Sequence, residues 1–453
     1  MTVSANKTNS REAILKGTVW TTAAYGLGQT LRLATNIALT RFLAPEIFGL
    51  MVIVNALKYG VDLVADIGIG QNVIYNKNGN TPEFYNTAWT LQIIRGLVLF
   101  VAGIAAAVPV AQIYQIPELI VIFPVVAIGF VLTGCTSMSV ALLQRRFQIA
   151  KLNAFDIVLT FMATVAQLAL AYAMPTVWSL VFGQLFAFAI RMVGSFFLLP
   201  DVRHRLTISK RYTWQILSFG KWITISSIVF FLSATFDRLY LASVIPLGLI
   251  GIYGITRSIS DMLTGLFVKL GNMIVFPLIA AHSNMPRAEL RGKLSSTRMK
   301  FLLVGGLGFS IFAGTVDLVI KLLLDQRYHA ASWMLPVLLV GSWFSILCSI
   351  NESMLLGVGK PLYSALANGV KFGCLLIGLP LILMQYGLIG GIIVVAAAEC
   401  FRYVSILIGQ IRERLSFGLQ DCLITLIVLA VMILVEWIRR ELGLGTPFDD
   451  FLK

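Results

Sequence analysis

Residues 38–75, ALTRFLAPEIFGLMVIVNALKYGVDLVADIGIGQNVIY, decide how the rest of the chain is interpreted. An apolar helix is predicted to end near Arg41, a short turn follows, and a second apolar helix is expected over 47–70. The polar side chains of that second helix, at offsets 0, +3, +7 and +11, are Asn55, Lys58, Asp62 and Asp66. These offsets place all four on one face of the helix. Charges inside a bilayer normally face a protein interior or a water-filled cavity, so we predict that this helix forms one wall of a polar cavity.

The composition indicates an all-α polytopic membrane protein. Of the 453 residues, 58% are hydrophobic and 12% are charged, whereas a soluble domain averages about 25% charged residues. Apolar runs of roughly 18–25 residues recur along the chain, and each is long enough to span a bilayer. The N-terminus is polar through Ala13, and the first apolar run is too long for a signal-peptide core, so we expect an uncleaved first transmembrane helix.

About twelve transmembrane helices are predicted. Their expected ranges are 17–41, 47–70, 88–110, 118–142, 153–174, 178–199, 216–243, 248–280, 301–324, 333–356, 362–384 and 387–409. A further apolar segment at 422–437 is short for a span and ends in Trp437, Arg439 and Arg440. It is consistent with a thirteenth helix or with an interfacial one, and a count of thirteen or fourteen helices stays open.

The distribution of basic residues predicts the orientation. With a cytoplasmic N-terminus, the inside segments hold 19 Lys and Arg residues, including Arg145, Arg203 and Arg298, and the outside loops hold 2. The positive-inside rule therefore predicts that the N-terminus and residues 410–420 are cytoplasmic. The same loops account for the net charge of +14, because basic loops contact anionic lipid head groups. We expect no nucleic-acid partner.

Similar motifs recur about 202 residues apart. Gly17-Thr-Val-Trp corresponds to Gly220-Lys-Trp-Ile, and FLAPEIFGLM at 42–51 corresponds to VIPLGLIGIY at 244–253. We therefore predict two pseudo-symmetric six-helix lobes around a central polar cavity. The expected divisions are an N-terminal lobe at 1–205, a C-terminal lobe at 206–410 and a C-terminal tail at 411–453. Transporters with such parallel repeats bind substrate between the halves and alternate access by rocking.

Polar side chains within the predicted helices are the candidate binding groups. The candidates for binding a diphosphate or a sugar in the cavity are Arg32, Gln29, Asn36, Asn55, Lys58, Arg95, Arg238, Arg257 and Lys371. Arginine suits an anionic substrate because it stays charged and binds phosphate in a bidentate way. The plainer interpretation is structural, since Lys58 with Asp62, and Arg257 with Asp261, are spaced to neutralise each other on one helix.

Carboxylates in the same helices are candidates for ion coupling, because burial can move a carboxyl pKa into the working range. These candidates are Asp62, Asp66, Asp237, Asp261 and Glu399. Catalytic, metal and cofactor motifs are not predicted. The segment LLGVGKPL at 355–362 lacks the Walker spacing, and the three histidines and five cysteines form no ligand pattern.

Several segments resemble the Wzx-like polysaccharide-transport flippases of the multidrug/oligosaccharidyl-lipid/polysaccharide exporter superfamily, of the colanic-acid and exopolysaccharide type. The segments that carry the resemblance are RFLAPEIFGLMVI (41–53), DIGIGQNVIYNK (66–77), ALLQRRFQIAKLNAFDIV (141–158), SFGKWITISSI (218–228), DRLYLASVIPLGLIGIYGITRSIS (237–260) and LLGVGKPLYSALANGVK (355–371). The resemblance implies a V-shaped bundle of two six-helix lobes. It also implies that the protein flips undecaprenyl-diphosphate-linked oligosaccharide units to the outer leaflet, with Arg32 and Arg257 as the first residues expected to contact the diphosphate.

Two other functions are weighed against this one. A related drug antiporter would favour an acidic cavity for cationic drugs, whereas the candidate residues here contain more Arg and Lys than carboxylates. A membrane polymerase or ligase would need a large outside loop, and the predicted outside loops are short. A peptidoglycan-precursor flippase is a close variant of the first function. We expect a monomer in the bacterial inner membrane, not an enzyme, with membrane lipids and polysaccharide polymerase machinery as candidate partners.

Overall fold

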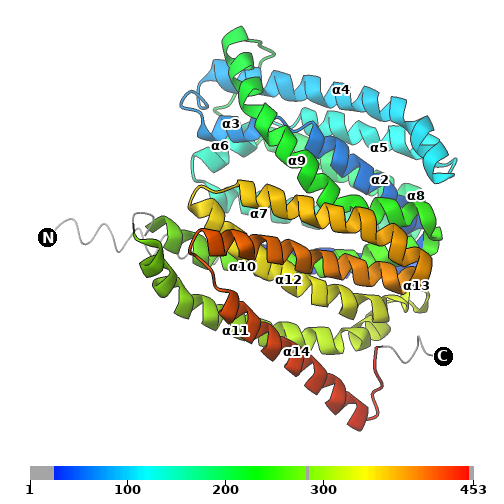
Figure 1. The fold of residues 1–453 in the computed structure, drawn as a ribbon. Coiled ribbons are helices and arrows are strands. Elements are labelled where there is room, and N and C mark those ends of the chain that lie inside the picture. The colour runs from blue at the N-terminus through cyan, green and yellow to red at the C-terminus, as the bar shows by residue number, and fades with distance from the viewer. Residues whose placement is uncertain (1–24, 282–284, 448–453) are drawn as a thin grey trace. The chain divides into compact units, whose positions relative to one another are not determined.

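The computed structural model describes residues 25–281 and 285–447, and its side-chain description leaves out 219–225 and 272–281. Within these ranges every regular secondary-structure element is a helix, and turns and irregular connections join the helices (Figure 1). Nine of the described helices are long and apolar enough to cross a membrane, and a tenth span is obtained if one bent pair is counted. The prediction of an all-α multi-pass membrane protein is confirmed. The predicted start of the first helix, at 17–24, lies outside the described residues.

The chain divides into two compact units. Unit 1 comprises residues up to 231 together with 238–247, and unit 2 comprises 232–237 and everything from 248 onward. The described part of the first helix covers residues 25–42. The other helices before residue 200 are α2 (Pro45–Val64), α3 (Ile69–Tyr75), α4 (Pro82–Tyr114), α5 (Leu119–Gly134), α6 (Ser139–Arg145), α7 (Ile149–Ala173) and α8 (Val177–Phe196). The later helices are α9 (Lys210–Val244), α10 (Leu247–Ala281), α11 (Arg287–Leu323), the 3₁₀ turn η1 (Gln326–Tyr328), α12 (Ala331–Gly357), α13 (Leu362–Arg412) and α14 (Gly418–Glu441). The predicted division at residue 205 falls in the connection between α8 and α9 and stays a prediction.

Two of the predicted helices in unit 1 are broken. The helix expected over 47–70 ends at Val64, and a separate short helix, α3, begins at Ile69. Gly68 lies between them with φ of 65°, a left-handed conformation that favours glycine, and its N–H donates to Asp66 Oδ1 at 2.9 Å. The helix expected over 118–142 is likewise interrupted, because α5 and α6 meet at a bend of 50°. Both predicted continuous helices are therefore wrong at these breaks.

The two short helices, α3 and α6, pack against each other at one end of unit 1. The Arg145 guanidinium at the end of α6 donates to the carbonyls of Val73, Ile74 and Asn76, at 2.6–3.0 Å, and so satisfies the C-terminal end of α3. The connection from α8 to α9 is bound to the same end, since the Met138 N–H donates to His204 Nε2 at 3.1 Å. These bonds fix the two helix breaks relative to each other.

Unit 2 contains a long helical element that the sequence predicts as two spans. The element α13 runs from Leu362 to Arg412, but Gly387 has φ of 63° and ψ of −157°, so the helix is kinked there. This kink falls where the predicted helices 362–384 and 387–409 meet. The structure therefore agrees with two successive spans joined by a sharp turn.

The apolar segment at 422–437 lies within the last helix, α14. It has 24 residues, is apolar enough to cross a membrane, and runs beside α11 (Figure 1). A buried ion pair joins the two helices near each end: Arg298 with Asp421, and Arg439 with Asp317. The Arg439–Asp317 pair is bidentate, with both N–O distances at 2.7 Å. The helix is thus an integral part of unit 2 and is long enough for a thirteenth span.

One residue assigned to a cytoplasmic loop lies elsewhere. Arg298 was expected in the connection at 281–300, but α11 already begins at Arg287, and the Arg298 side chain is 1% exposed. It also donates to Asn351 on α12 at 2.8 Å. The predicted loop position of Arg298 is wrong, because hydropathy counts a charged residue as loop, whereas a partner carboxylate allows it inside a bundle.

Candidate functional site

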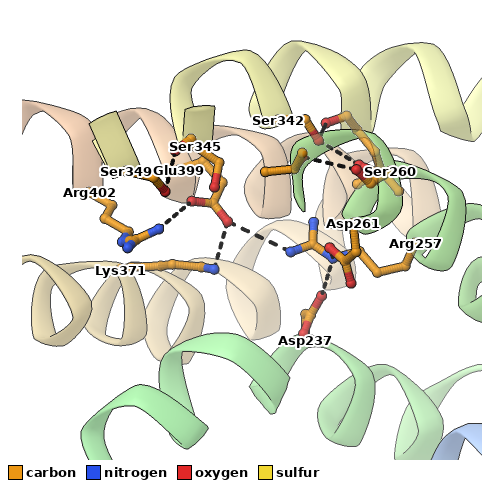
Figure 2. A network of polar contacts seen from close by, with 12 residues as sticks. Asp237, Arg257, Ser260, Asp261, Ser342, Ser345, Ser349, Lys371, Glu399 and Arg402 are labelled. Carbon is orange, nitrogen blue, oxygen red and sulfur yellow. Dashed lines mark hydrogen bonds and ion pairs between the residues drawn. The ribbon is translucent and has the colours of Figure 1, made fainter. Parts of the chain in front are cut away.

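Seven ionisable side chains gather inside unit 2 and form what we call the unit 2 charge network, and all of them except Glu352 are labelled in Figure 2. Its members are Asp237 on α9, Arg257 and Asp261 on α10, Glu352 on α12, and Lys371, Glu399 and Arg402 on α13. All of them come from residues of unit 2, so the geometry of the network lies within one compact body. Five of the seven are candidates predicted from the sequence: Asp237, Arg257, Asp261, Lys371 and Glu399.

Glu399 is the centre of the network. Lys371 Nζ donates to Glu399 Oε1 at 2.7 Å, and Arg257 Nη2 lies 3.7 Å from the same oxygen. Arg402 Nη1 lies 3.7 Å from Glu399 Oε2, and Arg402 Nη2 donates to Glu352 Oε2 at 2.8 Å. The Glu399 side chain is only 4% exposed. A buried charge without partners would be strongly destabilising. The three cations around Glu399 therefore stabilise its buried carboxylate.

Arg257 joins this centre to two aspartates. Its Nε lies 3.3 Å from Asp261 Oδ1, one helical turn away, and 3.9 Å from Asp237 Oδ2. The Tyr253 hydroxyl, also on α10, donates to Asp237 Oδ2. Asp237 is almost fully buried, whereas the side chain of Asp261 is 47% exposed. Asp261 is therefore the member of the network that is most accessible from outside unit 2.

The charges of the network nearly balance. Arg257, Lys371 and Arg402 stand against four carboxylates, so the fully ionised network carries one negative charge. It can take up one proton or one monovalent cation without acquiring a net positive charge. The argument that a cationic cavity favours an anionic substrate is not supported by this unit, because each of its three cations has a carboxylate partner.

Unit 1 holds a smaller group, the unit 1 charge cluster, formed by Lys58, Asp62 and Arg95. Lys58 Nζ lies 3.1 Å from Asp62 Oδ2, and Arg95 Nη2 on α4 donates to the Asp62 carbonyl oxygen at 2.6 Å and lies 3.2 Å from Oδ1. The Lys58 ammonium also lies 5.0 and 4.6 Å from the ring centres of Phe130 and Phe188. The helical periodicity therefore predicted correctly that Lys58 and Asp62 share a face.

The remaining candidates are not brought into either group. Asp66 lies beyond the end of α2 and accepts the Gly68 N–H, so its predicted position on the α2 face is wrong. Asn55 is on that face and accepts from Gln184 on α8 at 3.0 Å. The side chains of Gln29 and Asn36 are half-buried and that of Arg32 is exposed, all three on the helix at 25–42. Arg238 is half-buried next to Asp237 in sequence but is assigned to unit 1.

Sequence reasoning missed Glu352 and Tyr253 and gave Arg402 no role in the site. Glu352 lies within the apolar helix α12, and a carboxylate in such a run is a signal that could have been used. Tyr253 gives no such signal, because a tyrosine in a membrane helix is common. Only the contact of α10 with Asp237 assigns it to the network.

The comparisons with known proteins identify the class first. The structure is similar to that of the lipid II flippase MurJ in an inward closed conformation, with a TM-score of 0.70 and 11% identity over 96% of this chain and 100% of that one. It is also similar to an inward-facing multidrug resistance MATE family transporter of the MOP superfamily, with a TM-score of 0.68 and 14% identity over 85% of this chain and 94% of that one. The chain therefore shares its fold with the lipid II flippase MurJ and with the MATE family transporter.

The family follows from the sequence comparisons. Residues 38–332 match the model of the family described as polysaccharide biosynthesis protein. The chain is 21% identical over 364 residues to the lipopolysaccharide biosynthesis protein WzxC of Escherichia coli (strain K12), covering 79% of this chain and 70% of that protein. It is 23% identical over 403 residues to a putative O-antigen transporter of Shigella flexneri, covering 84% and 94%. The chain belongs to the polysaccharide biosynthesis protein family, which confirms the resemblance to Wzx-like flippases.

Proposed function

We propose that this protein moves undecaprenyl-diphosphate-linked oligosaccharide units from the cytoplasmic to the outer leaflet of the bacterial inner membrane. The proposed mechanism is alternating access by rocking of the two predicted lobes, 1–205 and 206–410. The observation that carries the proposal is the family match over 38–332 in a chain whose helices hold a network of seven ionisable groups, centred on the buried Glu399. Ionisable groups inside membrane helices commonly mark substrate or ion pathways.

The unit 2 charge network supports a coupling role. Arg257 has contacts of 3.3 to 3.9 Å with three carboxylates, and none of these three is a short bidentate pair. A diphosphate near Arg257 would compete with Asp261, the most accessible of the three. Release of Asp261 would leave a carboxylate that can take up a proton or a cation. We therefore assign anion contact to Arg257, with Lys371 behind it, and ion coupling to Asp261, Asp237 and Glu399.

An ion-coupled multidrug antiporter is the alternative function. The excess of carboxylates over cations in the unit 2 network is compatible with a cationic substrate, and the MATE transporter shares the fold. The family match favours the flippase, because the matching family and its relatives are named for polysaccharide and lipopolysaccharide biosynthesis or O-antigen transport.

We propose the following organisation for the protein in the membrane. The N-terminus is cytoplasmic, the chain acts as a monomer, and polysaccharide polymerase machinery is a candidate partner. The two functional halves divide near residue 205, and the central cavity between them holds the cargo. Since α14 follows the cytoplasmic segment at 410–420, its crossing would place the C-terminus outside.

The test is the leaflet distribution of undecaprenyl-linked oligosaccharide in cells that lack the protein. Rescue would be attempted with the wild type, with Arg32→Ala and Arg257→Ala combined, and with a control that combines Arg203→Ala and Arg291→Ala, two exposed basic residues. We expect units to accumulate on the cytoplasmic side without the protein. The wild type and the control should clear them, and the Arg32/Arg257 variant should not.

Two outcomes would contradict parts of this proposal. If units cross normally in cells without the protein, the flippase function fails, and cation and drug efflux should be measured next. If the Arg32/Arg257 variant is produced at the wild-type level and clears the units, the flippase function stands and these two arginines are not its anion contacts.

A further inference from the structure

Unit 1 contains a polar pocket that is separate from the unit 2 charge network. Its volume is about 360 Å³, and it lies among α2, α3, α4, α5, α6 and α8. The polar side chains that line it include Asp62, Gln71, Gln92, Arg95, Gln144 and Arg191. All of these residues belong to unit 1, so the shape of the pocket does not depend on how the two units are placed.

The pocket lies where both broken helices of unit 1 are interrupted. Residues 136–138 of the α5–α6 break line it directly, and Asp62 and Gly70 line it from either side of the α2–α3 break. Backbone outside a regular helix is tolerated within a membrane only where it is buried in protein or faces a cavity. Interrupted membrane helices typically form binding sites in transporters, because they expose backbone groups and helix ends.

The charges around the pocket favour a ligand with one negative charge. Asp62 is paired with Lys58 and Arg95, and Arg191 is paired with Asp156 at 2.7 Å. These five groups carry three positive charges and two negative ones, so the group has a net charge of +1. The Nε of Arg95 is buried without a hydrogen-bond partner among the described residues. A carboxylate carries a single negative charge, whereas a phosphate monoester carries about −1.5 to −2 at neutral pH.

The size and the remaining lining groups favour a sugar. A water molecule occupies about 30 Å³ in the liquid, so the pocket has the volume of about twelve water molecules. A lone inorganic ion needs far less space. Gln71 and Gln144 present amides, Thr133 presents a hydroxyl, and Phe130 adds an apolar surface. Planar amides and guanidinium groups can pair with adjacent hydroxyls and with a carboxylate.

We propose that this pocket binds one acidic monosaccharide, a sugar ring that carries a carboxylate, within the cargo oligosaccharide. The statement that this sugar belongs to the cargo rests on the proposed flippase function. The statement that the pocket binds an acidic sugar does not. Arg191 faces the carboxylate, Gln144 and Gln71 bind ring hydroxyls, and the Lys58–Asp62–Arg95 cluster fixes the wall between the two breaks.

The experiment is calorimetric titration of the purified full-length protein in nanodiscs with glucuronate, glucose and inorganic phosphate. We expect glucuronate to bind at least tenfold more tightly than glucose or phosphate. Arg191→Gln and Gln144→Leu should each weaken glucuronate binding at least tenfold. The matched controls Arg203→Gln and Gln148→Leu change exposed side chains outside the pocket lining and should bind as the wild type does.

Several results would overturn the proposal. It fails if phosphate binds as tightly as glucuronate, if glucose does so, or if folded wild type binds none of the three. It also fails if the pocket variants, with unchanged thermal stability, bind glucuronate as the controls do. Because the titration needs no transport, wild type that clears lipid-linked units in cells without binding glucuronate would retain the flippase function and remove this inference. If the protein binds glucuronate but does not clear lipid-linked units, the pocket is still a site for an acidic sugar, but that sugar is not shown to be part of the cargo.

Discussion

At the scale of single residues, Glu399 illustrates how one carboxylate organises a buried site. Three cations from α10 and α13 approach its two oxygens, and the shortest contact is 2.7 Å to Lys371. Within a bilayer such a group is stable only because its partners are fixed around it. Its loss should therefore affect both the stability of unit 2 and any transport that depends on the network.

We predict that Glu399→Gln destabilises the protein by about 3–5 kcal/mol, because three buried cations lose their common partner. The double variant with Lys371→Met should recover part of this loss. The measurement is thermal unfolding of the purified protein in detergent. The control is Glu289→Gln on the exposed side of α11, which should change stability by no more than about 0.5 kcal/mol. Equal unfolding temperatures for Glu399→Gln and wild type would contradict a central role for Glu399.

His204 lies in the connection between α8 and α9 and gives a pH-dependent prediction. Burial of its imidazole beside Trp89 and Phe196 lowers the pKa of His204 below its ordinary value. The pKa is then lower in the folded than in the unfolded chain, so the unfolded chain takes up the proton first as the pH falls. Stability should therefore decrease as the pH drops through the ordinary histidine pKa of about 6.5.

The measurement is thermal unfolding of purified wild type and His204→Gln between pH 8 and pH 5. Glutamine keeps an acceptor for the Met138 N–H but does not titrate in this range. We expect a shallower loss of stability at low pH in His204→Gln, and a wild-type slope in the control Arg203→Gln. Identical slopes in all three proteins would show that His204 does not set this dependence.

At the scale of secondary-structure elements, two buried ion pairs join α14 to α11, in addition to the apolar packing of the two helices. Arg439 donates to both carboxylate oxygens of Asp317 and to the Gly314 carbonyl, and the side chains of the pair are 4% and 1% exposed. These contacts hold the last turns of α14 against α11. Removing one partner leaves a buried charge without compensation.

We predict that Arg439→Met destabilises the protein by about 3–5 kcal/mol, because Asp317 stays buried without its cation. Arg440→Met is the matched control, since that neighbouring side chain is exposed, and its effect should be within about 0.5 kcal/mol. Replacing both Asp317 and Arg439 with Leu should be milder than Arg439→Met alone. Similar unfolding temperatures for Arg439→Met and Arg440→Met would contradict the importance of this pair.

The break between α2 and α3 depends on Gly68. Because its φ of 65° is left-handed, Gly68→Ala should destabilise unit 1 by about 1–2 kcal/mol. Gly70→Ala is the control, since Gly70 lies in α3 with open space around the position of a Cβ atom, and it should be neutral or slightly stabilising. Both variants can be compared by thermal unfolding. If Gly70→Ala lowers the stability as much as Gly68→Ala does, the left-handed conformation of Gly68 does not explain the loss.

At the scale of the whole molecule, the membrane orientation is a testable consequence of the proposed topology. The connection at 413–417 is expected in the cytoplasm, and α14, with 24 residues, is long enough to cross the membrane. We predict that green fluorescent protein fluoresces when fused at residue 416, and that alkaline phosphatase is active when fused after Lys453. The reverse fusions serve as controls. If the phosphatase is inactive after Lys453 but active at residue 416, the topology is the inverse of the proposed one.

The sequence by itself determined the class of the protein. Long apolar runs predicted the membrane helices, and the spacing of Lys58 and Asp62 predicted a shared polar face, because hydropathy and helical periodicity are local properties. The family resemblance followed from motifs spread along the chain and is confirmed by the match over 38–332. Five of the candidates, among them Glu399 and Lys371, were recognised because ionisable residues stand out within apolar helices.

Only the tertiary structure decided which of these charges are partners. Lys371 and Glu399 are 28 residues apart, and Arg298 and Asp421 are 123 apart, so no local pattern could pair them. The break after Val64 and the burial of Arg298 also contradicted the predictions made from hydropathy and periodicity. The physical reason is that a buried charge is stable only with a partner, and the partner is brought to it by helix packing across distant parts of the chain.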